Sequence, residues 1–388
     1  MKKDTVLINA GRSPEDNHGI VNPPVYHAST VVFPTVEALD KAQKRRFEGV
    51  YYGRYGTPTT FALEQAVAAL EGGDRCVSLP SGLAAINCAL LSFLGAGDHL
   101  LMIDNVYQPT RKLCGGLLKR IGIETTYYDP LIGASIAELI RPQTKVVFTE
   151  SPGSLTFEVQ DIGAVAEAAH RGGATVILDN TWSGGYFFAP FQHGVDVSVQ
   201  AATKYIVGHA DTMMGTITTT ERLYDKVKKT ASELGMCAGP DDCYLALRGL
   251  RSLSARMARH QENGLKLAGW LEGRPEVVKV LHPALEGCPG HAVWKRDFTG
   301  ASGLFGVLLK EGYAKPAVAA MLDGLELFAL GFSWGGYESL ILPTDPAQLR
   351  TATEWTHQGP NLRIHAGLED PDDLIADLEK GLARLNAP

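Results

Sequence analysis

The strongest constraint on the fold is a regular alternation of short apolar runs and helical patterns between about residue 60 and residue 200. Strands that alternate with helices favour a mostly parallel sheet with helices on both faces. The predicted strands are 75–79, 99–103, 124–128, 145–149, 175–178 and 195–200, and the helices between them are 61–71, 82–94, 109–121 and 162–171. Because such sheets bind ligands at the carboxyl ends of their strands, the turns after these strands are the expected places for chemistry.

The segments on either side of this region have different patterns. Pro23, Pro24 and Pro34 interrupt short aromatic runs, which predicts an extended arm with one short helix over 37–46. A long helical pattern over 241–271 leads to further strands at 276–281 and 303–309 and helices at 316–322 and 371–385. A chain of 388 residues exceeds what one core usually supports. We therefore predict an arm over 1–60, a large domain over 61–250 and a smaller α+β domain over 251–388.

Charge and composition exclude several classes of function. The net charge is −7 and the basic residues form no long block, so nucleic-acid binding is not expected. The start of the chain lacks the apolar core of a signal peptide, and no later run has the length of a membrane span. The six cysteines stand singly and the histidines form no metal-binding spacing, which predicts buried thiols, a cytoplasmic location and no metal.

Two charged residues follow predicted strands directly. Asp179 ends the buried pattern 175–178, where an acid faces the ligand crevice, although an aspartate there also suits an ordinary turn. Lys204 follows the strand 195–200 among small and apolar residues. An apolar setting lowers the pKa of a lysine amine and makes it a nucleophile. The alternative is that the Lys204 side chain extends to the surface.

Three further segments have unusual composition. The turn at 79–85 joins a strand to a helix through small residues, so its free backbone N–H groups suit a phosphate, although by itself it is also an ordinary turn. Ser333, Trp334 and two glycines after them allow backbone to approach a ligand beside an aromatic ring. Arg363 stands in a strand-like run and requires an anion, either a substrate carboxylate or an internal acid.

Taken in order, these motifs resemble the Cys/Met-metabolism family of pyridoxal phosphate (PLP) enzymes over essentially the whole chain. The matching segments are YGR at 52–54, PSGLAA at 80–85, DPLIGA at 129–134, ESPGS at 150–154, DNTW at 179–182, QAATKYIVGH at 200–209, WKRDFTG at 294–300, SWGGYESL at 333–340 and HAGLED at 365–370. The resemblance implies the aspartate-aminotransferase-like fold (PLP fold type I) and a homotetramer, a dimer of dimers with shared active sites.

The resemblance also assigns roles to individual residues. Lys204 would carry PLP and act as the base, Asp179 would pair with the pyridine nitrogen, and Tyr107 would stack on the ring. The cofactor phosphate would bind the backbone of Gly82 and Leu83, the Thr203 hydroxyl and, from the neighbouring subunit, Tyr52 and Arg54. Arg363 would bind the substrate carboxylate, with Ser333 and Trp334 nearby. Much of the family has a serine where this chain has Ala201, so one phosphate contact is absent.

The implied reaction is a carbon–sulfur lyase reaction, the α,β-elimination of L-cystathionine to homocysteine, pyruvate and ammonia in methionine biosynthesis. The residues themselves explain chemistry at Cα and leave γ-elimination, γ-replacement and racemisation open. A PLP-free binding protein on the same fold is a different class, but it would have lost Lys204 or Asp179.

Two positions depart from the β-lyases of this resemblance. Tyr55 stands where they have a second arginine, and Lys112 stands where they have an acid. We consider two hypotheses: that Lys112 binds the distal carboxylate of cystathionine, or that the enzyme is a broader cysteine-S-conjugate lyase or cysteine desulfhydrase. A surface substitution without consequence is the third interpretation.

Overall fold

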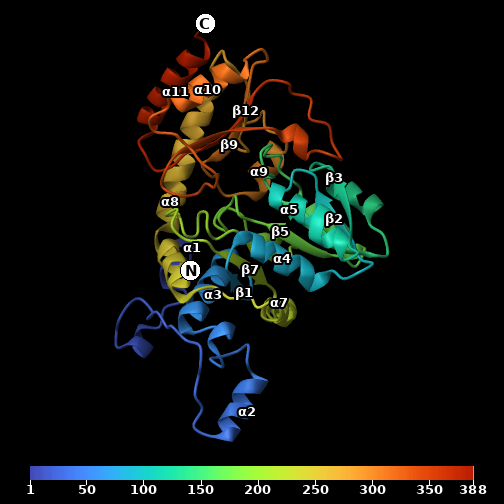
Figure 1. Ribbon diagram of the computed structural model, residues 1–388, viewed down its shortest axis with the longest axis vertical. Helices are drawn as coiled ribbons and strands as arrows, with labels where there is room; N and C mark the ends of the chain where they lie inside the picture. Colours follow the sequence, from blue (N-terminus) through green and yellow to red (C-terminus); the bar gives the residue numbers. More distant parts are fainter. Residues whose placement is uncertain (388) are drawn as a thin grey trace.

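The computed structural model describes residues 1–387, which form two sheets joined by one long helix (Figure 1). The first sheet has seven strands in the order β1-β7-β6-β5-β4-β2-β3. Their bounds are β1 Arg75–Leu79, β2 His99–Ile103, β3 Glu124–Tyr128, β4 Thr144–Glu150, β5 Thr175–Asp179, β6 Val197–Gln200 and β7 Gly215–Thr219. β7 runs antiparallel to both β1 and β6, and the pairs from β6 to β3 are parallel. The predicted mostly parallel sheet is therefore confirmed.

Helices cover this sheet because six of its seven strands bury nearly every residue, and only the edge strand β3 is mostly unburied. The helices of this part are α3 Pro58–Glu71, α4 Gly82–Phe93, α5 Gln108–Leu113, α6 Ile162–Arg171 and α7 Glu221–Glu233. α4 packs across β1, β4, β5, β6 and β7. Its N-terminus lies at the carboxyl end of β1, where the sequence predicts a ligand.

The second sheet is smaller and has five strands in the order β10-β11-β12-β9-β8. Their bounds are β8 Val277–Leu281, β9 Leu304–Leu309, β10 Ala329–Leu330, β11 Leu340–Thr344 and β12 Asn361–His365, and the accompanying helices are α9 His291–Asp297, α10 Lys315–Asp323 and α11 Pro371–Leu385. α8, Pro240–Glu272, contacts α3 beside the first sheet and α11 beside the second, and Figure 1 shows it running between the two regions.

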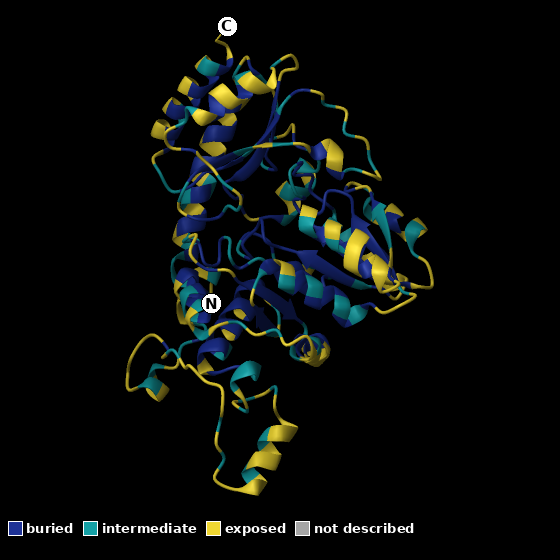
Figure 2. Ribbon diagram, in the orientation of Figure 1, coloured by how far each residue is buried: buried dark blue, intermediate teal, exposed yellow. Residues whose placement is uncertain are grey.

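The chain begins against α3 and α8, and the segment that follows extends away from both sheets (Figures 1 and 2). Its predicted helix is present as α2, Val36–Lys44, which has no buried residue. The sequence pattern does not predict α1, Lys3–Asn9, because this helix buries only Leu7 and is too short to give a clear helical period. The arm is therefore helical at its start and exposed over most of its length.

The other differences from the sequence prediction have local causes. The helix predicted over 109–121 becomes a π-helix over Cys114–Leu118, at the adjacent Gly115 and Gly116, where glycine weakens the ordinary helical pattern. β7 and α7 are not predicted at all. Five of the six cysteines are buried as expected, but Cys237 is exposed. Within residues 1–387, no helix is long and apolar enough to cross a membrane.

Candidate active site

Asp179 and Lys204 lie at the carboxyl ends of neighbouring strands, as the sequence predicts. Asp179 is the last residue of β5 and pairs in register with Val199 of β6. Thr181 links the two strand ends, because its hydroxyl donates to Asp179 Oδ1 at 2.5 Å and accepts the N–H of Ala201 at 2.9 Å. The Lys204 and Asp179 charges interact, and each influences the pKa of the other.

The Asp179 carboxylate is buried and incompletely satisfied. Its Oδ1 accepts the N–H and the hydroxyl of Thr181, whereas Oδ2 accepts no hydrogen bond from any described residue. Burial raises the pKa of Asp179, and the charge of Glu71 raises it further, against the hydrogen bonds from Thr181. Glu150, the partner of Asp179 in β4, has its pKa raised to about 8 by burial and by the Asp179 charge. Two adjacent buried acids therefore favour a cationic ligand at this edge.

The Lys204 amine points toward the second sheet. It donates to Ser333 Oγ at 2.5 Å and lies 5.3 Å from the centre of the Trp334 ring. Burial lowers its pKa to about 8, and the positive charge of Arg363 contributes to the lowering. About a tenth of the amine is thus neutral at pH 7, far more than for a lysine of ordinary pKa, and the neutral form is the one that acts as nucleophile or base.

Arg363 reaches the same place from the middle of β12. Its Nη2 donates to the carbonyl of Ser333 at 3.0 Å, and burial lowers its pKa. No carboxylate within residues 1–387 forms an ion pair with Arg363, so the alternative of an internal salt bridge does not hold for the described chain. The residue after Trp334 must be a glycine, because a Cβ on Gly335 would lie 3.0 Å from Lys204 Cα.

The start of α4 fits a phosphate. Ser81 caps the helix by accepting the Ala84 N–H, while the N–H groups of Gly82 and Leu83 have no partner in the described part of the chain. A Cβ at Gly82 would come within 2.5 Å of the Ala201 Cβ, so glycine keeps this approach open. The Thr203 hydroxyl donates to the Met214 carbonyl at 3.1 Å, so it must rotate to donate to a phosphate.

Tyr107 is half-exposed at the start of α5. Its N–H donates to Glu150 Oε2 at 2.8 Å. Burial raises the pKa of its hydroxyl, as do the charges of Asp179 and Glu150, whereas Arg363 opposes them. The Tyr107 side chain is therefore close enough to Asp179 and Arg363 to be affected by both charges. This position is consistent with a ring that stacks on a cofactor bound between those two residues.

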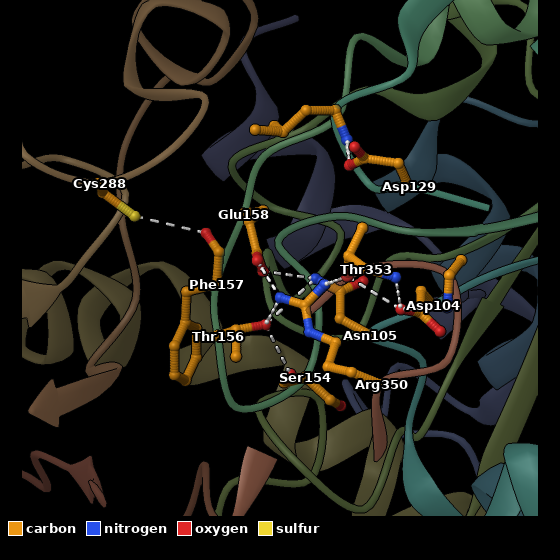
Figure 3. A network of polar contacts seen from close by, with 12 residues as sticks. Asp104, Asn105, Asp129, Ser154, Thr156, Phe157, Glu158, Cys288, Arg350 and Thr353 are labelled. Carbon is orange, nitrogen blue, oxygen red and sulfur yellow. Dashed lines mark hydrogen bonds and ion pairs between the residues drawn. The ribbon is translucent and has the colours of Figure 1, made fainter. Parts of the chain in front are cut away.

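A network of buried charges holds the loop that carries Tyr107 (Figure 3). Asp104 accepts hydrogen bonds from Arg111 at 2.6 Å and from the backbone N–H groups of residues 351, 352 and 353. Asn105 donates to Glu158 at 2.8 Å, and Glu158 forms a buried ion pair with Arg350. The network thus joins the loops after β2 and β4 to the segment between β11 and β12.

The arm residues lie elsewhere in the single chain. Arg54 donates to the carbonyl of Ser232 at the end of α7, and its guanidinium lies 4.7 Å from the centre of the Tyr55 ring. Tyr52 is exposed beside them, and Lys112 is exposed on α5. The structure brings nine of the predicted site residues to one region: Lys204, Asp179, Tyr107, Arg363, Ser333, Trp334, Gly82, Leu83 and Thr203. The arm residues Tyr52, Arg54 and Tyr55 form no contact with Lys204 in the described chain.

Three residues of this region, Glu150, Asp104 and Arg350, are not predicted from the sequence. Glu150 directly follows a predicted strand, and its position is the signal that could have identified it. Asp104 also follows a predicted strand. Arg350 gave no comparable signal, because its partner Glu158 is 192 positions away.

A buried carboxylate with a free oxygen, a lysine amine with a lowered pKa, an arginine without an ion-pair partner in the described chain and open N–H groups at a helix start together define a site for PLP and an amino acid. The chain belongs to the Cys/Met metabolism PLP-dependent enzyme family, whose pattern matches residues 4–383. Its cofactor is PLP.

Individual relatives align with this chain over nearly its full length. Cystathionine beta-lyase MetC of Escherichia coli (strain K12) is 46% identical over 390 residues, covering 99% of this chain and 99% of that protein. The L-alanine/L-glutamate racemase of Wolbachia pipientis wMel is 39% identical over 398 residues, covering 99% of this chain and 98% of that protein. The crystal structure of metB from Corynebacterium glutamicum superposes with a TM-score of 0.91 at 32% identity and covers 100% of this chain and 99% of that one. These similarities agree with the predicted fold type.

Proposed function

We propose that this protein catalyses the α,β-elimination of L-cystathionine to homocysteine, pyruvate and ammonia. The observation that carries the proposal is the meeting of Lys204 and Arg363 at Ser333, where Lys204 donates to the hydroxyl at 2.5 Å and Arg363 donates to the carbonyl at 3.0 Å, in a chain of this family. The chain is more similar to a cystathionine beta-lyase, at 46% identity, than to the racemase, at 39% identity, and this difference supports the lyase reaction among those of the family.

The chain's own residues supply binding and proton transfer. The unpaired Arg363 guanidinium binds the substrate α-carboxylate in bidentate fashion. PLP, when bound, would supply an electron sink for Cα, and Asp179 Oδ2 would hold the pyridine nitrogen in the protonated form that this requires. The Lys204 amine, released from Ser333 Oγ, takes the Cα proton as general base. The Lys204 ammonium would then return this proton to the sulfur as the Cβ–S bond breaks, so that homocysteine leaves as the thiol, and water would convert the remaining three-carbon fragment to pyruvate and ammonia.

We further propose the assembly, domain limits and location that the sequence suggests. An exposed arm that carries Tyr52 and Arg54 away from Lys204 suits a homotetramer, a dimer of dimers in which each arm completes the neighbour's phosphate site. The arm over 1–60, the large domain over 61–250, the C-terminal domain over 251–388 and a cytoplasmic location remain predictions.

Incubation of the PLP-loaded enzyme with L-cystathionine, with product identification by mass, tests the reaction. Pyruvate with homocysteine is expected. If 2-oxobutyrate and cysteine form instead, the enzyme is a γ-lyase. If only L-cysteine or other S-conjugates are cleaved, it is the broader lyase, and racemised L-alanine without sulfur release would make it a racemase, like its Wolbachia relative.

Lys112→Ala tests how the distal end of cystathionine is bound. We expect KM for L-cystathionine to rise about two-fold to five-fold, because an exposed charge pair contributes little more. KM for an S-conjugate without a distal carboxylate should not change, and Lys112→Arg should keep the wild-type value. Lys119→Ala, also an exposed lysine of this region, is the matched control. An unchanged KM for cystathionine in Lys112→Ala would remove the role from Lys112 and favour the broader lyase.

The lowered pKa of Lys204 predicts how PLP attachment depends on pH. Only the neutral amine reacts with the cofactor aldehyde, so the rate should rise about ten-fold per pH unit and level off near pH 8, the pKa of Lys204. Stopped-flow absorbance after mixing PLP with the cofactor-free protein measures this rate. N-α-acetyl-lysine in solution is the reference, and its rate should continue to rise toward pH 10. A protein rate that also rises to pH 10 would mean that the reacting lysine has an ordinary pKa.

A further inference from the structure

The turn formed by residues 333–336 connects Lys204 to Arg363, and its backbone is strained. The Ser333 hydroxyl meets the Lys204 amine and the Ser333 carbonyl meets Arg363. Ser333 has a φ of 89°, in the left-handed region that residues with a side chain rarely adopt. Such a conformation persists only where neighbouring groups hold it.

His365 is the side chain that holds this turn. It is the last residue of β12, two positions after Arg363, so both side chains project from the same face of that strand. The ring is 1% exposed, and its Nε2 lies 3.0 Å from the Gly335 nitrogen and 3.2 Å from the Gly336 carbonyl oxygen. The strand that supplies Arg363 therefore also supplies the support for its partner Ser333.

The two contacts of Nε2 require different protonation of the ring. An unprotonated Nε2 accepts the Gly335 N–H, whereas a protonated Nε2 donates to the Gly336 carbonyl and leaves that buried N–H without a partner. Each form leaves one buried N–H without a partner in the described chain, that of Gly335 or that of His365 Nδ1, so the count of unpaired N–H groups does not choose between them. The Gly335 N–H makes the shorter of the two contacts with Nε2, which favours the first form, with the ring proton on Nδ1.

The neighbouring histidine supports the same assignment. His260 of α8 lies with its ring centre 5.1 Å from that of His365 and donates from Nδ1 to the Ala366 carbonyl, so its Nε2 is unprotonated. His260 Nε2 and His365 Nδ1 are both buried without a hydrogen-bond partner in the described chain. With its proton on Nδ1, His365 presents an N–H to the neighbouring ring, on which His260 Nε2 carries a lone pair, so the two nitrogens have opposite partial charges. With its proton on Nε2, His365 would also present a lone pair, and the two nitrogens would have like partial charges.

We propose that His365 is a positioning residue for the reaction: its unprotonated Nε2 fixes the Gly335 N–H and so holds Ser333 between the Lys204 amine and Arg363. The inference rests on the proposed function in one respect, that Lys204 and Arg363 bind cofactor and substrate. The groups around the ring are His260, Tyr205, Lys204 and Arg363. Burial first, and then the charges of His260, Arg363 and Lys204, lower the pKa of His365, so the ring remains neutral while the enzyme works.

Three variants separate positioning from simple packing. His365→Phe keeps a ring but removes the acceptor, and we expect it to raise KM and lower kcat, with kcat/KM falling roughly ten-fold to a hundred-fold through one unpaired buried N–H. His365→Gln places an amide oxygen near the position of Nε2 and should restore most of the loss. His282→Phe is the matched control, since His282 is equally buried but bonds to Ala284 and Ser302. It should lose thermal stability and keep its KM. Wild-type kinetics in folded His365→Phe would overturn the proposal.

A second measurement needs neither cofactor nor substrate. Nitrogen-15 NMR of the histidine-labelled, cofactor-free protein, with the His365 signal assigned by its loss in His365→Gln, reports which ring nitrogen carries the proton. We expect a protonated Nδ1 and an unprotonated Nε2, and a proton on Nε2 would refute the positioning contact. Failure of the proposed function is distinguishable, because it would appear as wild-type enzyme that makes no pyruvate from cystathionine while the NMR result is unaffected.

Discussion

Lys204→Ala is expected to abolish turnover while leaving a folded protein. Loss of a general base lowers a rate roughly 100-fold to 10,000-fold, and loss of the residue that carries the cofactor adds to this. The side chain donates a single hydrogen bond, to Ser333, so its removal should cost little stability. Release of pyruvate from L-cystathionine measures the turnover, and mass analysis after borohydride reduction measures whether the cofactor is attached to the chain.

Two control variants define what the Lys204 result means. Lys204→Arg keeps the positive charge but not a group that becomes neutral near pH 8, so it should be as inactive as Lys204→Ala. Lys145→Ala removes an exposed lysine of β4 and should retain full activity. Attachment of PLP to a different lysine in the reduced wild-type protein would contradict the assignment.

The residues that sequence reasoning found share one property, that their role depends on local order along the chain. Asp179 ends β5 and Lys204 comes four positions after the end of β6, and parallel strands place their carboxyl ends at one edge. The pattern at 79–85 predicts the helix start of α4 for the same reason. A short segment and its period were enough to locate these groups, although not the hydrogen bond from Lys204 to Ser333.

The site residues that the sequence pattern does not reveal depend on contacts between distant segments of the chain. Asp104 accepts the N–H of Thr351, which is 247 positions away, and no local pattern indicates that pairing. His365 stands within a strand-like run, where a buried histidine is ordinary, and its role depends on the turn at 333–336. Tertiary packing decides which buried polar groups meet, and this cannot be obtained from hydrophobic period alone.

The buried pair of Glu158 and Arg350 yields the largest expected effect on stability (Figure 3). Their side chains are 11% and 6% exposed. Arg350 also donates to Thr353 at 2.8 Å, and Glu158 accepts from Asn105 at 2.8 Å. Leu155 and Phe157, in the same loop as Glu158, have φ values of 64° and 57°, so this loop is strained and requires such support.

Arg350→Met should lower the free energy of unfolding by roughly 3 to 5 kcal/mol, because it leaves the Glu158 carboxylate buried without its cation. Glu158→Gln should cost a similar amount for the converse reason. The double variant should lose less than the sum of the two, since it removes both charges together. Urea unfolding of the cofactor-free protein measures all three. Arg171→Ala breaks an exposed pair with Glu167 on α6 and should change stability by only about 0.3 to 0.5 kcal/mol. If the losses of the two single variants sum to the loss of the double variant, Glu158 and Arg350 do not depend on each other for stability.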